Sequence, residues 1–302
     1  MTESSSLSKW QIWWLAARPR TLPASIAGVV MGSALAWWQG RWHLPSALLA
    51  LLGAILLQIG SNLANDVYDF ERGADTAERL GPLRVTRAGL LSPQEVKRGM
   101  WIVFLLAALI GAFLIARTGW PIALVGITAI LAAIGYTGGP FPLGYYGLGD
   151  LFVFLYFGLA SVVGTYYVQA LELSPVAWWM ALPIGALTTA ILVVNNLRDL
   201  AQDRAAGKRT LAVSLGEKGT CWEYTLLVLF AFGLLPILIG LKLLPWGAIV
   251  PWLSLPQAVA LIRQVWQVRG RALNATLAGT GQLALRYSLL FWLGLLLAKV
   301  FP

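Results

Sequence analysis

The sequence predicts an all-α polytopic membrane protein. Of its 302 residues, 58% are hydrophobic and only 12% are charged, whereas a soluble domain carries roughly 25% charged residues. The apolar residues also occur in long segments that are typical of helices crossing a bilayer. These two observations exclude a soluble globular protein, a disordered chain and a disulfide-stabilised scaffold.

Nine segments are predicted as transmembrane helices, because a spanning helix requires about 20 mostly apolar residues. In chain order they are residues 21–38, 45–65, 99–116, 120–138, 148–170, 175–196, 221–241, 246–262 and 283–300. The eighth contains Pro251 and Pro256, which membrane helices tolerate where neighbouring groups satisfy the freed backbone. Residues 1–9 are polar and show no signal-peptide cleavage site, so we expect a cytoplasmic tail there.

The basic residues predict the orientation of the chain. With the N-terminus in the cytoplasm, 18 of the 22 lysines and arginines fall on the cytoplasmic side of the predicted helices. Cytoplasmic loops carry such an excess. We therefore expect an integral protein of the cell (inner or plasma) membrane, in contact with membrane lipid, whose C-terminus lies on the opposite side. Topology then explains the net charge of +9, and no nucleic-acid partner is expected.

Two scarce residue types limit the possible chemistry. The chain has one cysteine, Cys221, so an intrachain disulfide is excluded. It has one histidine, His43, so a multi-histidine metal site is excluded. Any bound metal must therefore be held by oxygen ligands, which favours Mg²⁺ or a similar hard cation.

The acidic residues are concentrated in two segments on the predicted cytoplasmic side. Nine of the 13 lie in residues 61–98 and 196–220. Residues three or four apart share a helix face, so each segment predicts one polar stripe at the end of a helix. The first stripe is Asn62, Asp66 and Asp69, and the second is Asn195, Asp199 and Asp203.

The two stripes also predict an internal repeat. Asp66 and Asp199 are 133 residues apart. Each motif follows a helix that enters from outside and precedes a basic, glycine-containing loop. We therefore expect one domain over residues 1–302, built from two pseudo-repeat halves with motifs at 62–75 and 195–208.

Two facing acidic stripes would repel each other unless a cation lay between them. Mg²⁺ suits this position, because it takes one or two carboxylates and completes its shell with water and substrate phosphate. Nearby basic residues suit the remaining phosphate oxygens; they are Arg84, Arg87, Arg198, Lys208 and Arg209. The pattern predicts a diphosphate held by metal at the membrane surface, with its tail in the membrane.

Other functions explain the pattern less well. Solvated loops with ordinary helix-end charges do not require matched polar stripes in two halves. A secondary transporter usually carries ionisable residues near mid-membrane, whereas these lie at one interface. A non-catalytic membrane scaffold would have no use for four matched aspartates.

At these residues the chain resembles the UbiA superfamily of intramembrane aromatic prenyltransferases, and the resemblance covers nearly the whole chain. The matching segments are residues 18–25, 61–66, 79–84, 136–140, 147–150, 164–169, 195–199 and 207–211. The paired aspartate motifs are specific to the superfamily. The segments 136–140 and 81–84 resemble the branch that acts on 1,4-dihydroxy-2-naphthoate in menaquinone synthesis.

The resemblance implies nine transmembrane helices around a central cavity with cytoplasmic cap loops. It implies Mg²⁺-dependent transfer of a polyprenyl group from polyprenyl diphosphate to 1,4-dihydroxy-2-naphthoate with decarboxylation. The catalytic and metal-binding residues it implies are Asp66, Asp69, Asp199 and Asp203. The substrate-binding residues it implies are Asn62, Asn65, Arg84, Tyr136, Asn195, Asn196, Arg198 and Lys208.

The sequence departs from the family pattern at two places. The last aspartate of the first motif falls on Gly73, with Asp75 two residues later, which leaves the role of Asp75 open. Many relatives with benzoate acceptors carry a basic residue shortly after the Tyr136 position, where this chain has residues 138–140, Gly-Gly-Pro. A benzoate or homogentisate acceptor stays the alternative. We expect Asp150 either to stabilise the N-terminus of the helix that it begins, through its negative charge, or to line the cavity mouth.

Overall fold

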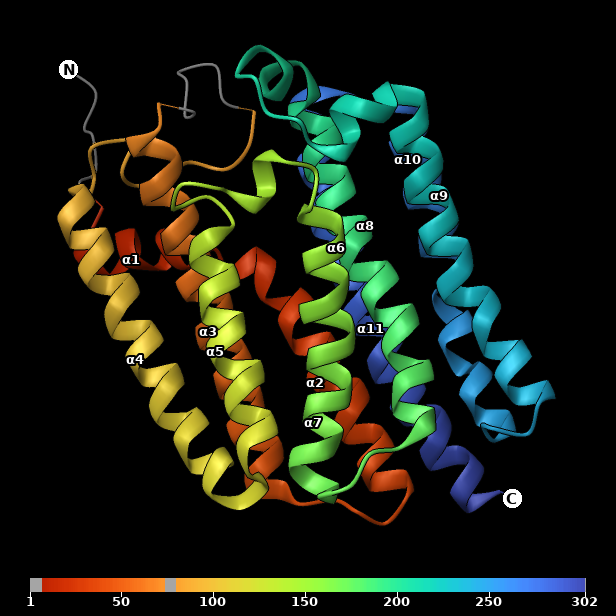
Figure 1. The fold of residues 1–302 in the computed structure, drawn as a ribbon. Helices are drawn as coiled ribbons and strands as arrows, with labels where there is room; N and C mark the ends of the chain where they lie inside the picture. The colour runs from red at the N-terminus through yellow and green to blue at the C-terminus, as the bar shows by residue number, and fades with distance from the viewer. Residues whose placement is uncertain (1–6, 74–79, 302) are drawn as a thin grey trace.

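The structure is a bundle of helices, most of which run along one common axis (Figure 1). This computed structural model describes residues 7–73 and 80–301. Within those residues the ordered elements are all helices, and none is a strand. Asp75 and Arg79 lie outside the described residues.

The long helices begin and end as follows: α2 (Leu22–Trp38), α3 (Leu44–Glu71), α4 (Pro93–Thr118), α5 (Trp120–Gly135), α8 (Pro175–Ala205), α9 (Leu211–Gly240), α10 (Leu255–Gln267) and α11 (Leu273–Val300). One further span is continuous and consists of α6 (Gly149–Val153), the π-helical η3 (Phe154–Ala160) and α7 (Ser161–Ala170). The remaining elements are α1 (Lys9–Ala17), η1 (Pro19–Thr21), η2 (Leu143–Tyr145), η4 (Trp246–Ser254) and η5 (Gly270–Ala272).

Nine apolar helical segments make up the bundle in the described part of the chain. Eight of them are 22 to 31 residues long and apolar enough to cross a membrane when α1 and η1 are counted with α2, η4 with α10, and η5 with α11; α5 is a shorter apolar helix. The predicted all-α fold with nine spans is therefore confirmed.

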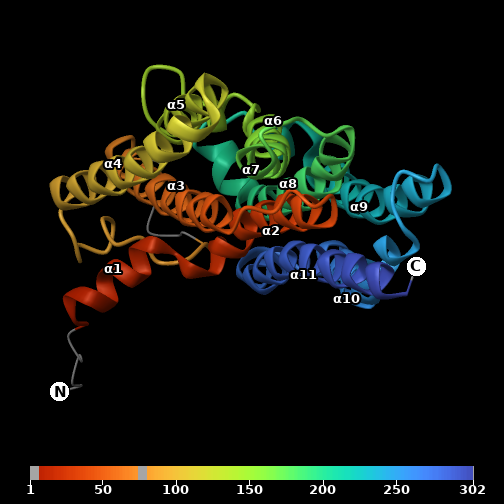
Figure 2. The same ribbon diagram turned by 90° about the horizontal axis from the view of Figure 1, so that it is seen from below.

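Several helix boundaries differ from the sequence prediction; for example, α8 ends at Ala205 rather than at 196, and α9 begins at Leu211 rather than at 221. An additional helix, α1, lies between the expected N-terminal tail of residues 1–9 and the first predicted span, and it lies outside the ring of long helices (Figure 2). The last helix begins at Leu273, ten residues before the predicted start at 283, and Arg286, which the count of cytoplasmic basic residues included, lies well inside it. Its guanidinium is exposed on the bundle surface and donates from Nη1 to Gln257 Oε1 at 2.7 Å. A polar partner on α10 thus offsets part of the cost of a charge within a span.

Local sequence signals set several helix boundaries. Ser92 caps α4, and Glu95 reaches back to the Ser92 backbone, which forms a complete capping box. Thr210 caps α9 through the backbone N–H of Val213. The helix α9 bends at Gly216, whose φ of 70° lies in the left-handed region that glycine adopts without strain.

The helix α8 lies at the centre of the packing. Its side chains Met180, Ile184 and Leu187 are fully buried in a core shared with α2, α9 and α11. In both views α4 and α5 lie at one end of the bundle, and α9 and α10 at the other (Figures 1 and 2). The arrangement leaves α2, α3, α7 and α8 to surround the middle.

Three connecting segments meet at the end of the bundle where α3 and α8 finish, and we call this end the motif end. They are the described parts of residues 72–92, residues 136–148 and residues 206–210. Arg72 ties the first to the second by donating to the carbonyl oxygens of Thr137 and Gly139. Arg209 N–H ties the third to the second by donating to Tyr145 O at 2.9 Å.

We expect Gly294→Ala to destabilise the protein, because η4 and α11 cross in contact at Gly247 and Gly294. A Cβ at residue 294 would lie 1.9 Å from the Gly247 carbonyl oxygen, and overpacking of this kind costs about 1–3 kcal/mol. The measurement is the apparent thermal midpoint in detergent. Gly233→Ala is the control, because nothing lies within 4 Å of that added Cβ. Equal midpoints for the two variants would contradict the expectation.

Candidate active site

A cavity of about 810 Å³ runs through the middle of the bundle from the motif end. Its polar end is lined by Asp69, Arg84, Asp199, Asp203 and Lys208. The rest of its wall is mainly apolar and comes from α2, α3, α4, α5, η3, α7 and α8. The cavity therefore joins a charged mouth to an apolar shaft.

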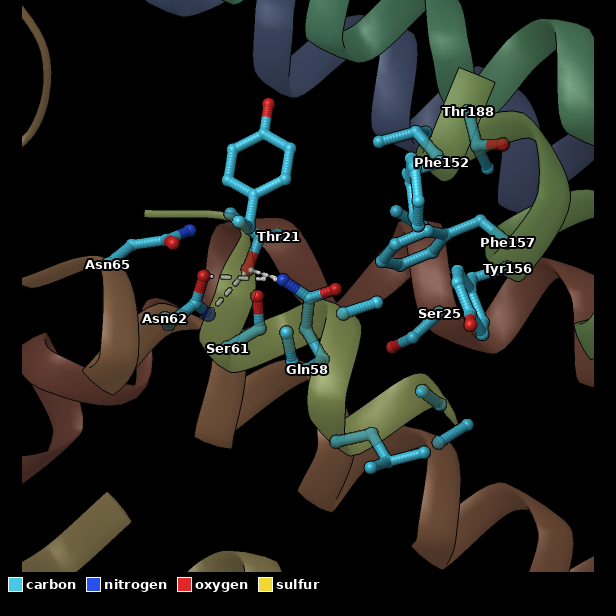
Figure 3. Close-up of a pocket in the computed structure, with 18 of the residues that line it drawn as sticks. Thr21, Ser25, Gln58, Ser61, Asn62, Asn65, Phe152, Tyr156, Phe157 and Thr188 are labelled. Carbon is cyan, nitrogen blue, oxygen red and sulfur yellow. Dashed lines mark hydrogen bonds between the residues drawn. The ribbon is translucent and has the colours of Figure 1, made fainter. Parts of the chain in front are cut away.

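One face of α3 forms much of the polar wall. Gln58, Ser61, Asn62, Asn65 and Asp69 all line the cavity, and their spacing of three or four residues keeps them on one helix face. Figure 3 shows the first four of these residues on the cavity wall. Asn62 Nδ2 donates to Ala17 O at 2.9 Å and to Thr21 Oγ1 at 3.0 Å, so this residue also anchors the turn between α1 and α2.

Asp69 is the carboxylate on which the connecting segments converge. It is only 4% exposed. Arg84 Nη2 donates to its Oδ2 at 2.5 Å, and the Tyr145 hydroxyl donates to its Oδ1 at 2.8 Å. Burial and the Asp69 charge hold the pKa of the Tyr145 phenol well above its usual range. Tyr145 therefore stays protonated and continues to donate to Asp69.

Asp66 lies outside the cavity wall. It is 1% exposed and accepts hydrogen bonds from the backbone N–H groups of Val85, at 3.2 Å, and Thr86, at 3.1 Å. Arg18 approaches it at 3.6 Å. The structure thus differs from the predicted stripe of Asn62, Asp66 and Asp69. The spacing leaves Asp66 at the edge of the cavity-facing side of α3, and the backbone N–H groups of Val85 and Thr86 hold its carboxylate there, while Asn65 lines the cavity beside it.

The second motif brings both of its aspartates to the cavity. Asn195, Asn196, Asp199 and Asp203 line it along α8. Lys208 Nζ lies 3.5 Å from Asp203 Oδ1 and 4.6 Å from the centre of the Tyr145 ring. The third connecting segment is therefore joined to both the second motif and the second segment.

Arg198 does not reach the cavity. Its side chain is 1% exposed. It donates to both carboxylate oxygens of Asp199, to Asn195 Oδ1 at 2.8 Å and to Asn274 Oδ1 at 2.7 Å. These contacts occupy its guanidinium, so the geometry gives Arg198 a role in orienting Asp199 rather than in meeting a substrate phosphate.

No sequence motif points to Asn274, which lies in the last helix. It accepts from Arg198, and its Nδ2 donates to Leu80 O at 2.9 Å. It therefore connects the second motif to the segment that carries Arg84. Gln58 was also absent from the predicted site, although its position four residues before Asn62 was a usable signal.

Tyr136 follows α5 and lines the cavity. Gly144 and Gly149 pack against its ring, since a Cβ at either would lie 2.8 Å from a Tyr136 side-chain atom. Burial and the charge of Asp150 raise the pKa of the Tyr136 phenol. Tyr136 is therefore a protonated, firmly packed aromatic at the polar end of the cavity.

The chemistry of the mouth suits a divalent cation together with a polyanion. Asp69, Asp199 and Asp203 all line the mouth of the cavity, and Arg84 and Lys208 line it beside them. The three carboxylates offer oxygen ligands, which fits Mg²⁺. The described residues do not contain three or more acidic, histidine or cysteine side chains gathered as a complete metal site. A phosphate ligand would supply the missing oxygens.

This fold and site define an intramembrane helical protein that can hold a phosphorylated headgroup at one interface and an apolar chain in its interior. The UbiA prenyltransferase family matches residues 25–278. The chain belongs to this family.

Named relatives agree with that membership, and a solved structure shares the fold. The chain is 41% identical to the 1,4-dihydroxy-2-naphthoate octaprenyltransferase of Escherichia coli (strain K12), over 99% of each chain. It is 41% identical to the enzyme of the same name from Mycobacterium tuberculosis, over 92% of this chain and 94% of that one. Its fold is similar to a UbiA homolog from Archaeoglobus fulgidus bound to GPP and Mg²⁺, with a TM-score of 0.68 at 15% identity, over 94% of this chain and 99% of that one.

We expect Asp66→Asn to loosen the segment after α3, because an amide offers one acceptor oxygen where the carboxylate offers two. The measurement is hydrogen exchange at the Val85 and Thr86 amides. Loss of one such bond predicts exchange faster by on the order of ten-fold. Asp203→Asn, on α8, is the control and leaves these amides protected. Unchanged exchange in Asp66→Asn would contradict the assigned contact.

Proposed function

We propose that this protein transfers a polyprenyl group from polyprenyl diphosphate to 1,4-dihydroxy-2-naphthoate, with loss of CO₂, in a Mg²⁺-dependent reaction. The product is a prenylated naphthol precursor of menaquinone. The observation that carries the proposal is the cavity itself, in which Asp69, Asp199 and Asp203 face Arg84 and Lys208 at the mouth of an apolar shaft. The names of the relatives support the choice of acceptor.

The charged mouth binds the diphosphate. Asp69, Asp199 and Asp203 would hold Mg²⁺, which when bound neutralises the charge that develops on the leaving diphosphate. Arg84 and Lys208 add positive charge to the same place, and they need no reorganisation because Asp69, Asp203 and Tyr145 already fix them. Asp66 acts indirectly by holding the backbone next to Arg84.

The bond between the allylic carbon and the diphosphate oxygen breaks, and its electron pair leaves with the diphosphate. An electron pair of the naphthoate ring forms the new bond to the allylic carbon. Loss of CO₂ returns the electron pair of the broken C–C bond to the ring. The apolar walls keep water away from the cationic carbon, and the Tyr136 ring at the polar end favours positive charge near its face.

The shaft accepts the prenyl tail. Small residues of α3, α4 and α5 line it: Ala50, Gly53, Ala54, Ala107, Ala108, Gly111, Ala123, Gly126 and Ala129. From Ala50 to Asp69 the cavity follows α3 over 19 residues, or about 28 Å at 1.5 Å per residue. A wall of small apolar side chains at this depth suits an extended isoprenoid.

The orientation proposed for the chain places the motif end at the cytoplasmic face. Moving Arg286 into α11 leaves 17 of the 22 basic residues on that side. The excess still supports this orientation by the positive-inside rule. The active site therefore faces the cytoplasm, and the C-terminus lies on the other side of the membrane.

We expect Asp69→Asn and Asp203→Asn each to lower kcat by on the order of 100-fold or more, as loss of preorganised charge does at other sites. The assay supplies polyprenyl diphosphate, Mg²⁺ and dihydroxynaphthoate to protein in nanodiscs. EDTA abolishes the activity and added Mg²⁺ restores it. Glu71→Gln is the control, because Glu71 ends the same helix and pairs with Lys97 outside the cavity. Full activity of both aspartate variants would overturn the mechanism.

The same assay tests the acceptor. Prenylation of 4-hydroxybenzoate with none of dihydroxynaphthoate would overturn the proposed substrate while leaving the reaction class in place. Absence of any prenyl transfer would overturn both.

Cysteine labelling tests the orientation. The experiment uses a Cys221→Ala background and cells in which the reagent can reach the inner membrane from outside. A membrane-impermeant maleimide is expected to label Lys242→Cys and to spare Arg204→Cys. Both positions are exposed, and they lie at opposite ends of the long helices. The reverse labelling pattern would overturn the orientation.

A further inference from the structure

On the cavity face of α3, further from the motif end than Asp69, the side chains form a hydrogen-bond network. Backbone carbonyls determine which side-chain atoms in this network donate and which accept. Thr21 Oγ1 donates to Arg18 O at 2.9 Å, so the hydroxyl proton of Thr21 is already used. Asn62 Nδ2 donates to Ala17 O at 2.9 Å, so the amide nitrogen of Asn62 faces the backbone. Thr21 Oγ1 and Asn62 Oδ1 are consequently left as acceptors.

These two acceptors determine how the Gln58 amide is turned. Its Nε2 donates to Thr21 Oγ1 at 3.3 Å and to Asn62 Oδ1 at 3.2 Å (Figure 3). The opposite orientation would set its oxygen against two other acceptors. The Gln58 oxygen therefore points away from Asn62, and it is buried with no hydrogen-bond partner in the part of the chain that the structure describes. An unsatisfied buried acceptor costs about 1–3 kcal/mol, so this position favours a ligand that brings a donor.

Ser61 adds a hydroxyl that the fold does not use. Ser25 and Thr188 also line the cavity, but their hydroxyls donate to carbonyls of their own helices, Leu22 O at 3.0 Å and Ile184 O at 2.8 Å. The Ser61 hydroxyl has no hydrogen bond to any described residue. It remains available to a molecule in the cavity.

Asn65 completes this strip one turn closer to the mouth. Its Oδ1 accepts from Thr137 Oγ1 at 3.0 Å, which leaves the two Nδ2 donors turned the other way. At 1.5 Å per residue, Asn65 and Ser61 lie about 6 Å and 12 Å from Asp69 along α3. An aromatic ring held beside Asn65 and Ser61 would therefore lie next to the allylic carbon of a prenyl diphosphate whose phosphates are bound at Asp69.

An aromatic wall completes the same part of the cavity. Phe152, Tyr156 and Phe157 line it from α6 and η3 (Figure 3). The rings of Phe152 and Tyr156 are stacked with centroids 6.1 Å apart. Flat apolar faces on one side and polar groups along α3 suit a planar aromatic ligand with a polar edge.

We propose that Gln58, Ser61 and Asn65 recognise the polar edge of the acceptor, an aromatic ring with a hydroxyl beside a carboxylate. Ser61 and Asn65 donate to the carboxylate, and the Gln58 oxygen accepts the proton of the hydroxyl. This hydrogen bond also raises the electron density of the ring that attacks the allylic carbon. The assignment rests on the proposed function and adds to it the residues that select the acceptor.

The test compares two stable ligands that differ by one hydroxyl. Isothermal titration of protein in nanodiscs measures the affinity for 1-hydroxy-2-naphthoate and for 2-naphthoate. Gln58→Leu is expected to weaken binding of the hydroxylated ligand by about ten-fold and to leave 2-naphthoate within about two-fold of wild type. Ser61→Ala is expected to weaken both ligands, because both carry the carboxylate.

Controls separate recognition from folding. Ser25→Ala removes a hydroxyl from the same cavity that is already bonded to its own helix, and it is expected to bind both ligands as wild type does. Each variant is also titrated with geranyl S-thiolodiphosphate, whose unchanged affinity reports an intact mouth. In turnover, Ser61→Ala is expected to raise KM for dihydroxynaphthoate without changing KM for the prenyl diphosphate.

The outcomes are distinguishable. Wild-type affinity for both naphthoates in Ser61→Ala and Gln58→Leu would overturn this assignment while prenyl transfer stands. An equal loss for both ligands in Gln58→Leu would also overturn the hydroxyl contact. If Gln58→Leu does not fold, Ser61→Ala alone decides between support and rejection. Failure of the wild-type protein to bind or prenylate any naphthoate would instead overturn the proposed function.

Discussion

The buried ion pair between Asp69 and Arg84 is the contact on which the mouth of the cavity depends. The Arg84 and Asp69 side chains are 7% and 6% exposed, and removing one partner of such a pair typically costs about 3–5 kcal/mol because the other charge is left buried. Tyr145 joins the same carboxylate from the second connecting segment, and Lys208 packs on Tyr145 from the third. One carboxylate thus orders three segments that are far apart in the sequence. The same residues line the mouth of the cavity and supply its charge.

Neighbouring polar residues have unequal roles around this centre. Asp69 faces the cavity, whereas Asp66 holds backbone amides beside Arg84. Asp199 faces the cavity, whereas Arg198 lies outside it and donates to Asp199 and to Asn274. Asn274 in turn donates to the carbonyl oxygen of Leu80. The residues that contact a ligand are therefore supported by a layer that does not. That support matters at a catalytic site, because small displacements of the reacting groups lower the rate.

The fold and the class of chemistry followed from features that do not depend on tertiary detail. Long apolar segments define membrane spans wherever they pack. Because the chain has only one histidine and one cysteine, a metal site built mainly from those residues is excluded. The ends of the helices were harder to predict. Arg286 was counted on the cytoplasmic side, but α11 begins ten residues before its predicted start and carries Arg286 well inside the helix, with Gln257 of α10 as its polar partner. Hydropathy marks the apolar part of a helix and does not mark how far the backbone hydrogen bonds continue.

The sequence by itself determined that the chain crosses a membrane nine times and that two acidic motifs finish helices on one side. It did so because apolar length and charge are properties of single segments. Only the tertiary structure decided which motif residues meet. The spacing of Asp66 and Asp69 allowed both to face inward, and the contacts of Val85 and Thr86 turned Asp66 to the connecting segment. Gln58 and Asn274 acquired their significance in the same way, because hydrogen-bond partners more than 30 residues distant fix their orientation.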